Sequence, residues 1–141
     1  MKKILILNSS YYKDISKNLL FSAKKKLIQN KFSVYVLNVP GVYEIPVAIR
    51  KNIKKYDGFV ALGCVIKGET PHFDFICSSV FNSILNLSVN FNKPIGNGII
   101  TALNISQAKN RSIKNNKNKP NKGSESANAV VRILKNEPKK I

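Results

Sequence analysis

Residues 61–75 read Ala-Leu-Gly-Cys-Val-Ile-Lys-Gly-Glu-Thr-Pro-His-Phe-Asp-Phe and contain the clearest junction between a strand and a helix in this chain. The apolar run over residues 59–66 is typical of a strand whose two faces are both buried. Thr70 precedes Pro71, the order expected of an N-cap and a first helical position. A buried strand, a glycine loop and a helix in succession predict a parallel sheet, whose ligands bind at such junctions.

The single histidine of the chain, His72, comes one residue after this predicted helix start. Backbone N–H groups at the start of a helix face outward and favour an anion. By itself, a histidine at this place has two interpretations, a structural side chain or an ionisable group beside a ligand. The junction therefore predicts an anion-binding site at the start of the helix, with the His72 imidazole beside it.

Strands and helices alternate along the rest of the chain. Apolar periodicities predict strands at residues 2–8, 33–39, 58–66 and 94–101, and helices at residues 14–30, 44–54, 71–91, 105–111 and 124–136. Residues 112–122 have no apolar period and predict a basic loop. The alternation predicts an α/β fold of one domain over residues 1–141, with a four-stranded parallel sheet and helices on both faces.

Right-handed crossovers place every strand-to-helix loop of such a sheet at one edge. Residues that end or follow the predicted strands are therefore expected near one another: Tyr11, Tyr43, Glu44, Thr70, His72 and Thr101. Gly96 and Gly98 fall inside the fourth predicted strand, which indicates close approach by another backbone or by a ligand.

The charge of the chain is strongly positive, with 24 Lys and Arg against 7 Asp and Glu and a net charge of +17. Such a balance suits a polyanion, because Lys and Arg displace counterions from phosphates. The lysines are spread along the chain, however, and no nucleic-acid-binding motif accompanies them. Nucleic acid is therefore not expected as the main partner, whereas a small phosphorylated substrate would suit this charge.

The longest apolar run is far shorter than the roughly 20 residues of a membrane span. Asn8 and the polar residues after it end the first apolar run too soon for a signal peptide, so this run is interpreted as a strand. Cys64 and Cys77 lack metal-type spacing and are interpreted as reduced thiols of the core. Together these features predict a cytoplasmic protein without a membrane or metal partner.

The sequence motifs of three common parallel-sheet proteins are absent. There is no glycine-rich turn after the first strand, as in dinucleotide-binding folds, no P-loop, and no acidic cluster at the end of that strand, as in phosphoacceptor domains. Four other stretches together resemble the 6,7-dimethyl-8-ribityllumazine synthase family, and they span most of the chain. They are residues 40–46 (Pro-Gly-Val-Tyr-Glu-Ile-Pro), 63–74 (Gly-Cys-Val-Ile-Lys-Gly-Glu-Thr-Pro-His-Phe-Asp), 94–101 (Pro-Ile-Gly-Asn-Gly-Ile-Ile-Thr) with Gln107-Ala108, and 121–127 (Asn-Lys-Gly-Ser-Glu-Ser-Ala).

The resemblance implies a flavodoxin-like three-layer sandwich and an enzyme of riboflavin biosynthesis. In this family 5-amino-6-(D-ribitylamino)uracil condenses with 3,4-dihydroxy-2-butanone 4-phosphate, losing phosphate and water, without a cofactor or metal. The reaction passes through an imine, elimination of phosphate and ring closure. These steps need proton transfer, an anion site and close positioning of the two substrates.

The resemblance also implies roles for individual residues at the phosphate. His72 matches the proton-transferring histidine, and Glu69 and Thr70 match the pair whose backbone and hydroxyl contact the phosphate. Arg111 matches the phosphate-binding arginine, for which a bidentate guanidinium is well suited. Its place at the end of a predicted helix also fits a solvent-facing side chain. Lys122 matches a lysine near the phosphate.

For the pyrimidine, Tyr11 matches the aromatic residue that stacks on the ring, with Tyr12 as a one-residue alternative. The further contacts to the ribityl-pyrimidine match Val42, Tyr43, Glu44, Cys64, Val65 and Ile66. Tyr43 also has an interpretation as a core aromatic.

In the family the site lies between subunits, so Asn97, Arg111 and Lys122 are expected to come from a neighbouring copy. A homopentamer is the expected unit, alone or paired into a decamer. The loop between Arg111 and Lys122 is longer than in relatives that build large shells, which favours the smaller assemblies.

Three positions depart from the family pattern. Lys67 replaces a usual arginine, Glu69 replaces a usually small residue, and Asn97 stands where many members have phenylalanine. Glu69 and Asn97 leave open a second function, that of a flavin- or lumazine-binding homologue with weak or no catalysis. Riboflavin synthase of the same fold is a further alternative, but residues 68–72 favour lumazine formation.

Overall fold

Four strands form one sheet in the order β2–β1–β3–β4, and every neighbouring pair is parallel. The strands are β1 (Lys3–Ser9), β2 (Ser33–Val39), β3 (Gly58–Ile66) and β4 (Ile95–Ala102). These are taken from a computed structural model that describes residues 1–113 and 121–141. The predicted four-stranded parallel sheet is confirmed.

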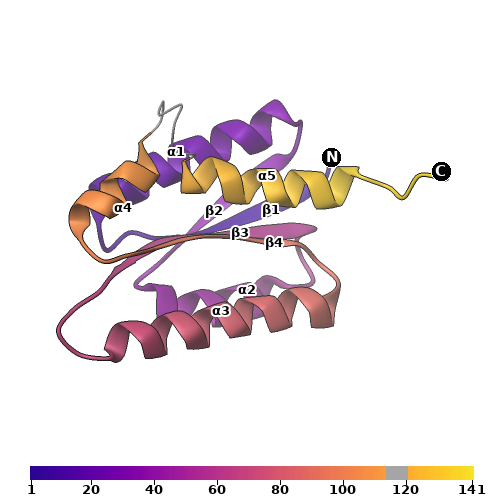
Figure 1. Cartoon of the computed structure of the whole chain (residues 1–141). Helices are drawn as coiled ribbons and strands as arrows, with labels where there is room; N and C mark the ends of the chain where they lie inside the picture. Colours follow the sequence, from indigo (N-terminus) through magenta and orange to yellow (C-terminus); the bar gives the residue numbers. More distant parts are fainter. Residues whose placement is uncertain (114–120) are drawn as a thin grey trace.

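Helices cover both faces of this sheet, as Figure 1 shows. On one face lie α1 (Lys13–Gln29), α4 (Ile105–Ser112) and α5 (Lys122–Lys135), and on the other lie α2 (Ile45–Asn52) and α3 (His72–Phe91). A short 3₁₀ turn, η1 (Val42–Glu44), joins β2 to α2. The arrangement is the predicted three-layer α/β sandwich.

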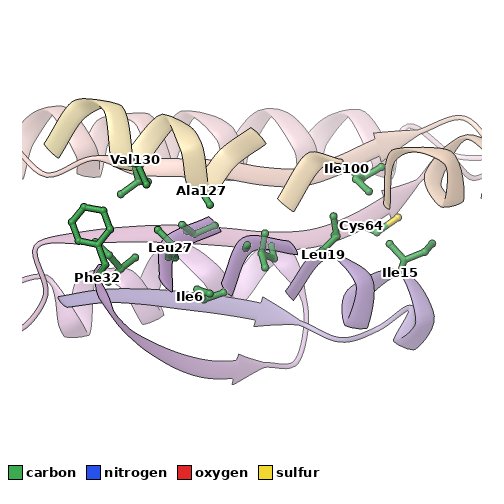
Figure 2. Close-up of a cluster of buried hydrophobic side chains, with 14 of the residues drawn as sticks. Ile6, Ile15, Leu19, Leu27, Phe32, Cys64, Ile100, Ala127 and Val130 are labelled. Atoms are coloured by element: carbon green, nitrogen blue, oxygen red, sulfur yellow. The ribbon is translucent and has the colours of Figure 1, made fainter. Parts of the chain in front are cut away.

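The central strands of the sheet are buried on both faces because their side chains alternate between two hydrophobic cores. In β1, Ile4 and Ile6 face the cluster under α1 and α5, whereas Leu5 and Leu7 face the cluster under α2 and α3. Figure 2 shows the first cluster, in which Ile6 lies below side chains from several helices. Two buried faces explain why the central strands read as continuous apolar runs rather than as alternating ones.

The predicted start of α3 was one residue too early. The helix begins at His72 and its N-cap is Pro71, whose side chain has no hydrogen-bonding group. Thr70 still contributes to the start, because its Oγ1 accepts a long hydrogen bond of 3.4 Å from the backbone N–H of His72. The loop before the helix is therefore positioned by Thr70 without Thr70 being the cap.

The last helix begins two residues earlier than the periodicity predicted, at Lys122. Asn121 is its N-cap, and the Asn121 Oδ1 accepts a hydrogen bond of 3.0 Å from the backbone N–H of Ser124. The predicted basic loop was therefore too long at both ends, since Ser112 belongs to α4. Its central part, residues 114–120, lies outside the described residues.

The prediction of close approach at the β4 glycines is confirmed. A Cβ at Gly96 would lie 2.2 Å from the backbone oxygen of Ser126, and a Cβ at Gly98 would lie 2.5 Å from the Ser126 hydroxyl. The absence of side chains at these two positions lets α5 pack directly on the sheet. In the described part of the chain, no helix is long and apolar enough to cross a membrane.

We expect Gly96→Ala to lower the free energy of unfolding by about 2 kcal/mol, because the added methyl group must push α5 away from β4. Urea denaturation followed by circular dichroism would measure the loss. Gly68→Ala is the matched control, since a Cβ at Gly68 has nothing within 4 Å. Equal stability of the two variants would contradict the tight β4–α5 contact.

Candidate active site

A cavity of about 310 Å³ opens at the carboxyl ends of β1 and β3. The chain runs from β1 to β2 on one side and returns to β3 on the other, so this is the point where the strand order reverses. Open α/β sheets bind ligands in the crevice that forms at such a point. The lining residues are Ser9, Tyr11, Tyr12, Gly41, Val42, Tyr43, Cys64, Val65, Ile66, His72 and Ile76.

His72 reaches this cavity from the first position of α3. Its side chain is exposed, and so are residues 67–71 of the loop before it. Glu69 and Thr70 lie in this loop, next to the cavity but outside its lining. An imidazole beside a helix start can exchange a proton with a ligand that the N-terminal end of the helix attracts.

Tyr11 and Tyr12 both line the cavity, but they have different environments. Their rings make a T-shaped contact with centroids 5.0 Å apart and an interplanar angle of 74°. Tyr12 packs against the core under α1, whereas Tyr11 is 76% exposed. The ring that is free to stack on a planar ligand is therefore Tyr11, held from behind by the edge-to-face contact with Tyr12.

The η1 turn places two residues at the cavity and one beside it. Val42 is buried and Tyr43 is 65% exposed, so the interpretation of Tyr43 as a core aromatic is wrong. Glu44 lies in a second hollow of about 470 Å³ between α2 and α3, which Tyr43 also lines. Tyr43 therefore lines both hollows.

Cys64, Val65 and Ile66 form the carboxyl end of β3 and contribute the central wall of the cavity. Burial raises the pKa of the Cys64 thiol to about 11. Burial also raises the pKa of Cys77, helped by the Asp74 carboxylate one turn before it. Both thiols are free; Cys64 is buried as predicted, whereas Cys77 is only partly buried.

We expect Cys64 to resist alkylation by iodoacetamide at pH 7.5, where only about one thiol in several thousand is ionised if its pKa is 11. The rate should rise roughly tenfold for each pH unit up to that pKa. Because folding raises this pKa above its ordinary value of 9.0, the free energy of unfolding should fall as the pH rises from 9 towards 11. Mass spectrometry of the folded and urea-unfolded protein checks this; fast labelling of folded Cys64 at pH 7.5 would contradict it.

Three predicted site residues lie away from this cavity. Arg111 near the end of α4 and Lys122 at the start of α5 belong to the layer formed by α1, α4 and α5, and both contact Glu125 at 3.6 Å. Asn97 in β4 points to the α2/α3 face, since Gly96 and Gly98 contact α5. One copy of the chain does not bring these three residues into the cavity.

Thr101, which was expected at the same edge, pairs with Val65 in the sheet and does not line the cavity. Three lining residues were missed by the sequence prediction, namely Ser9, Gly41 and Ile76. Ser9 ends β1, and that position is the signal by which it could have been found. Ile76 falls inside the predicted helix at residues 71–91, and apolar periodicity does not show which end of a helix borders a cavity.

The described residues contain no group of three or more His, Cys, Asp or Glu side chains placed to hold a metal ion. The polar groups available to a ligand at the cavity are hydroxyls, one imidazole and the backbone N–H groups at the start of α3. Such a set can bind a planar ring and an anion and can move a proton between them.

Comparisons with known proteins identify relatives of this chain. A family model described as 6,7-dimethyl-8-ribityllumazine synthase matches residues 1–137. A protein of that name from Bartonella tribocorum is 38% identical over 135 residues, covering 94% of this chain and 89% of the relative. The protein of that name from Afipia carboxidovorans is 36% identical, and the match covers 94% of this chain and 84% of the relative. The one from Agrobacterium fabrum is 37% identical, and the match covers 94% of both chains.

Proposed function

The chain belongs to the 6,7-dimethyl-8-ribityllumazine synthase family, a family of transferases of riboflavin biosynthesis, and we propose how its residues divide the work of the condensation. Its function is the formation of 6,7-dimethyl-8-ribityllumazine. We propose 5-amino-6-(D-ribitylamino)uracil and 3,4-dihydroxy-2-butanone 4-phosphate as its substrates and residues 1–141 as a single catalytic domain. The observation that carries the proposal is the cavity at the β1–β3 switch point, which both Tyr11 and His72 line.

The ribityl-pyrimidine occupies the 310 Å³ cavity in this proposal. Tyr11 stacks on the pyrimidine ring, and its high exposure supports this role. The wall from Cys64 to Ile66 and the turn from Val42 to Glu44 supply the remaining contacts. Backbone groups at the ends of parallel strands and at a turn suit this task, because their positions are set by the sheet rather than by flexible side chains.

The phosphate of the second substrate lies at the start of α3, beside Glu69 and Thr70. There the amine of the pyrimidine reaches the ketone to form the imine, and phosphate leaves in the elimination step. His72 transfers protons in these steps, since its imidazole is exposed and lines the cavity. The positive end of the helix dipole attracts the phosphate and so brings it close to this imidazole.

We further propose a homopentamer, alone or paired into a decamer, with sites between subunits. The outer face of α3 supports this: Phe75, Leu85 and Val89 are 69%, 62% and 71% exposed. The buried residues of this helix within one copy are Val80 and Ile84 alone. A helix that is apolar on its outer face as well needs a second surface to cover it. A neighbouring copy would also supply Asn97, Arg111 and Lys122 to the cavity.

The assembly makes a prediction about mass. Five chains of 15.7 kDa give about 79 kDa, and ten give about 157 kDa. Light scattering after size exclusion should find one of these values, and Leu85→Asp should shift the protein to the monomer mass and remove its activity. Asn86→Asp adds the same charge at an exposed neighbouring position of α3 and serves as the control. A native mass near a megadalton would contradict the small assembly.

The proposal is tested directly by mixing the purified protein with both substrates. Lumazine absorbance and phosphate release should both rise above the uncatalysed rate, in proportion to the protein concentration. A second candidate, a flavin- or lumazine-binding protein with weak catalysis, is favoured by Glu69 and Asn97. It predicts lumazine binding without acceleration in the same assay. Both free cysteines fit a reducing compartment, and we propose the cytoplasm.

A further inference from the structure

Glu125 in the first turn of α5 contacts both of the cations assigned to the phosphate. Its Oε2 lies 3.6 Å from the Arg111 Nη2, and its Oε1 lies 3.6 Å from the Lys122 Nζ. One carboxylate thus uses each of its oxygens for a different cation. The resemblance described above implies no role for Glu125.

These two ion pairs leave the cations incompletely satisfied. Charge-assisted hydrogen bonds between nitrogen and oxygen are usually about 2.7–2.9 Å long, so 3.6 Å marks loose pairing. In addition, the Arg111 Nε is buried and has no hydrogen-bond partner within the described residues. A buried donor without an acceptor is costly, so the loose contact with Glu125 leaves the Arg111 guanidinium incompletely satisfied.

The geometry around these residues is held by neighbouring contacts. The Asn121 side chain donates a hydrogen bond of 2.8 Å to the Ser112 carbonyl and accepts one from Ser124, so it joins the end of α4 to the start of α5. A Cβ at Gly123 would lie 2.3 Å from the Leu19 carbonyl oxygen, so the start of α5 is pressed against α1. Arg111, Lys122 and Glu125 therefore lie on helices whose ends are held by packing and hydrogen bonds. This packing keeps the three charged side chains close together.

We propose that Glu125 is an internal anion that holds Arg111 and Lys122 when no phosphate is bound and competes with phosphate for them. The inference rests on the proposed function, since it takes Arg111 and Lys122 as phosphate ligands. Binding exchanges ionic contacts and forms or breaks no covalent bond. After the elimination step, inorganic phosphate leaves more readily because the Glu125 carboxylate repels it and takes back the two cations.

A purely structural role for Glu125 makes a different prediction. A carboxylate in the first turn of a helix interacts favourably with the helix dipole, so its loss would lower stability without changing the affinity for phosphate. Phosphate affinity is therefore the measurement that separates competition from helix stabilisation.

The test compares Glu125→Gln with the wild type and with Glu137→Gln, which makes the same charge change in the exposed segment after α5. Calorimetry measures the Kd of inorganic phosphate, and steady-state kinetics measures its Ki as a product inhibitor. We expect both constants to fall five- to tenfold in Glu125→Gln and to stay at the wild-type value in Glu137→Gln.

An unchanged or weaker phosphate affinity in Glu125→Gln would overturn the inference, and so would an equal gain in Glu137→Gln. The two proposals fail separately. A wild-type protein that forms no lumazine contradicts the proposed function, whereas calorimetry of phosphate judges Glu125 without any turnover.

Discussion

Replacing His72 with alanine is expected to lower kcat about a hundredfold, the lower end of what a positioned general acid or base contributes. The side chain stands at the first position of α3, on the rim of the cavity, and it is the only histidine in the chain. Its removal takes away the imidazole that is proposed to transfer protons during the condensation. The remaining activity comes from holding the two substrates together, which needs no proton transfer.

Stopped-flow or steady-state measurement of lumazine formation checks this expectation. Because His72 is exposed, the variant should fold normally, and its unfolding curve should match that of the wild type. His72→Gln, which keeps a polar side chain but does not titrate, should lose as much as the alanine variant. Unchanged turnover in His72→Ala would contradict the catalytic role of His72. If His72→Gln keeps the wild-type turnover while His72→Ala loses it, the side chain acts by hydrogen bonding and not by proton transfer.

Replacing Arg111 with alanine is expected to raise the KM for 3,4-dihydroxy-2-butanone 4-phosphate about thirtyfold, with little change in the KM for the pyrimidine. A hydrogen bond to a charged group contributes about 1.5–3 kcal/mol, and 2 kcal/mol corresponds to roughly thirtyfold in binding. The guanidinium is partly buried, and among the described residues its only ion-pair partner is Glu125, at 3.6 Å, so we expect it to bind the phosphate. Steady-state kinetics with each substrate varied in turn measures the effect.

Lys109→Ala is the matched control, because it removes an exposed positive charge from the same helix α4. Lys109→Ala should leave both KM values near those of the wild type. A thirtyfold effect in both variants would indicate general electrostatic attraction, which high salt would weaken. An unchanged KM in Arg111→Ala would support the alternative of a solvent-facing helix end.

The strands were predictable to within a residue because short apolar runs that end at polar or turn residues mark them, even in the edge strand β2, which is largely exposed. For β2 and β3 the predicted and observed bounds agree, and for β1 and β4 they differ by one residue at each end. Helix starts were less predictable, since they depend on hydrogen bonds at single residues. The N-cap of α5 is Asn121, so the helix begins at Lys122, two residues before the predicted start at residue 124. The hydrogen bond that makes Asn121 the cap is seen only in the folded chain.

The candidate site was partly predictable because the sequence shows where the strands end. Residues at the ends of β1 and β3, such as Tyr11 and Cys64, gather at one edge in any parallel sheet of this strand order. The distinction between Tyr11 and Tyr12 was beyond the sequence, because both follow the same strand. Only the packing of Tyr12 on the α1 core shows that Tyr11 is the exposed ring.

The sequence by itself determined the alternation of strands and helices, the strand-to-helix junction at residues 67–72 and the likeness to a family. Those features depend on residue order and local periodicity, which act over a few turns of backbone. Only the tertiary structure decided that Arg111 and Lys122 meet the carboxylate of Glu125 and that the outer face of α3 stays uncovered in one copy. These facts depend on how α4, α5 and α3 pack on the sheet, and packing joins residues that no local pattern relates.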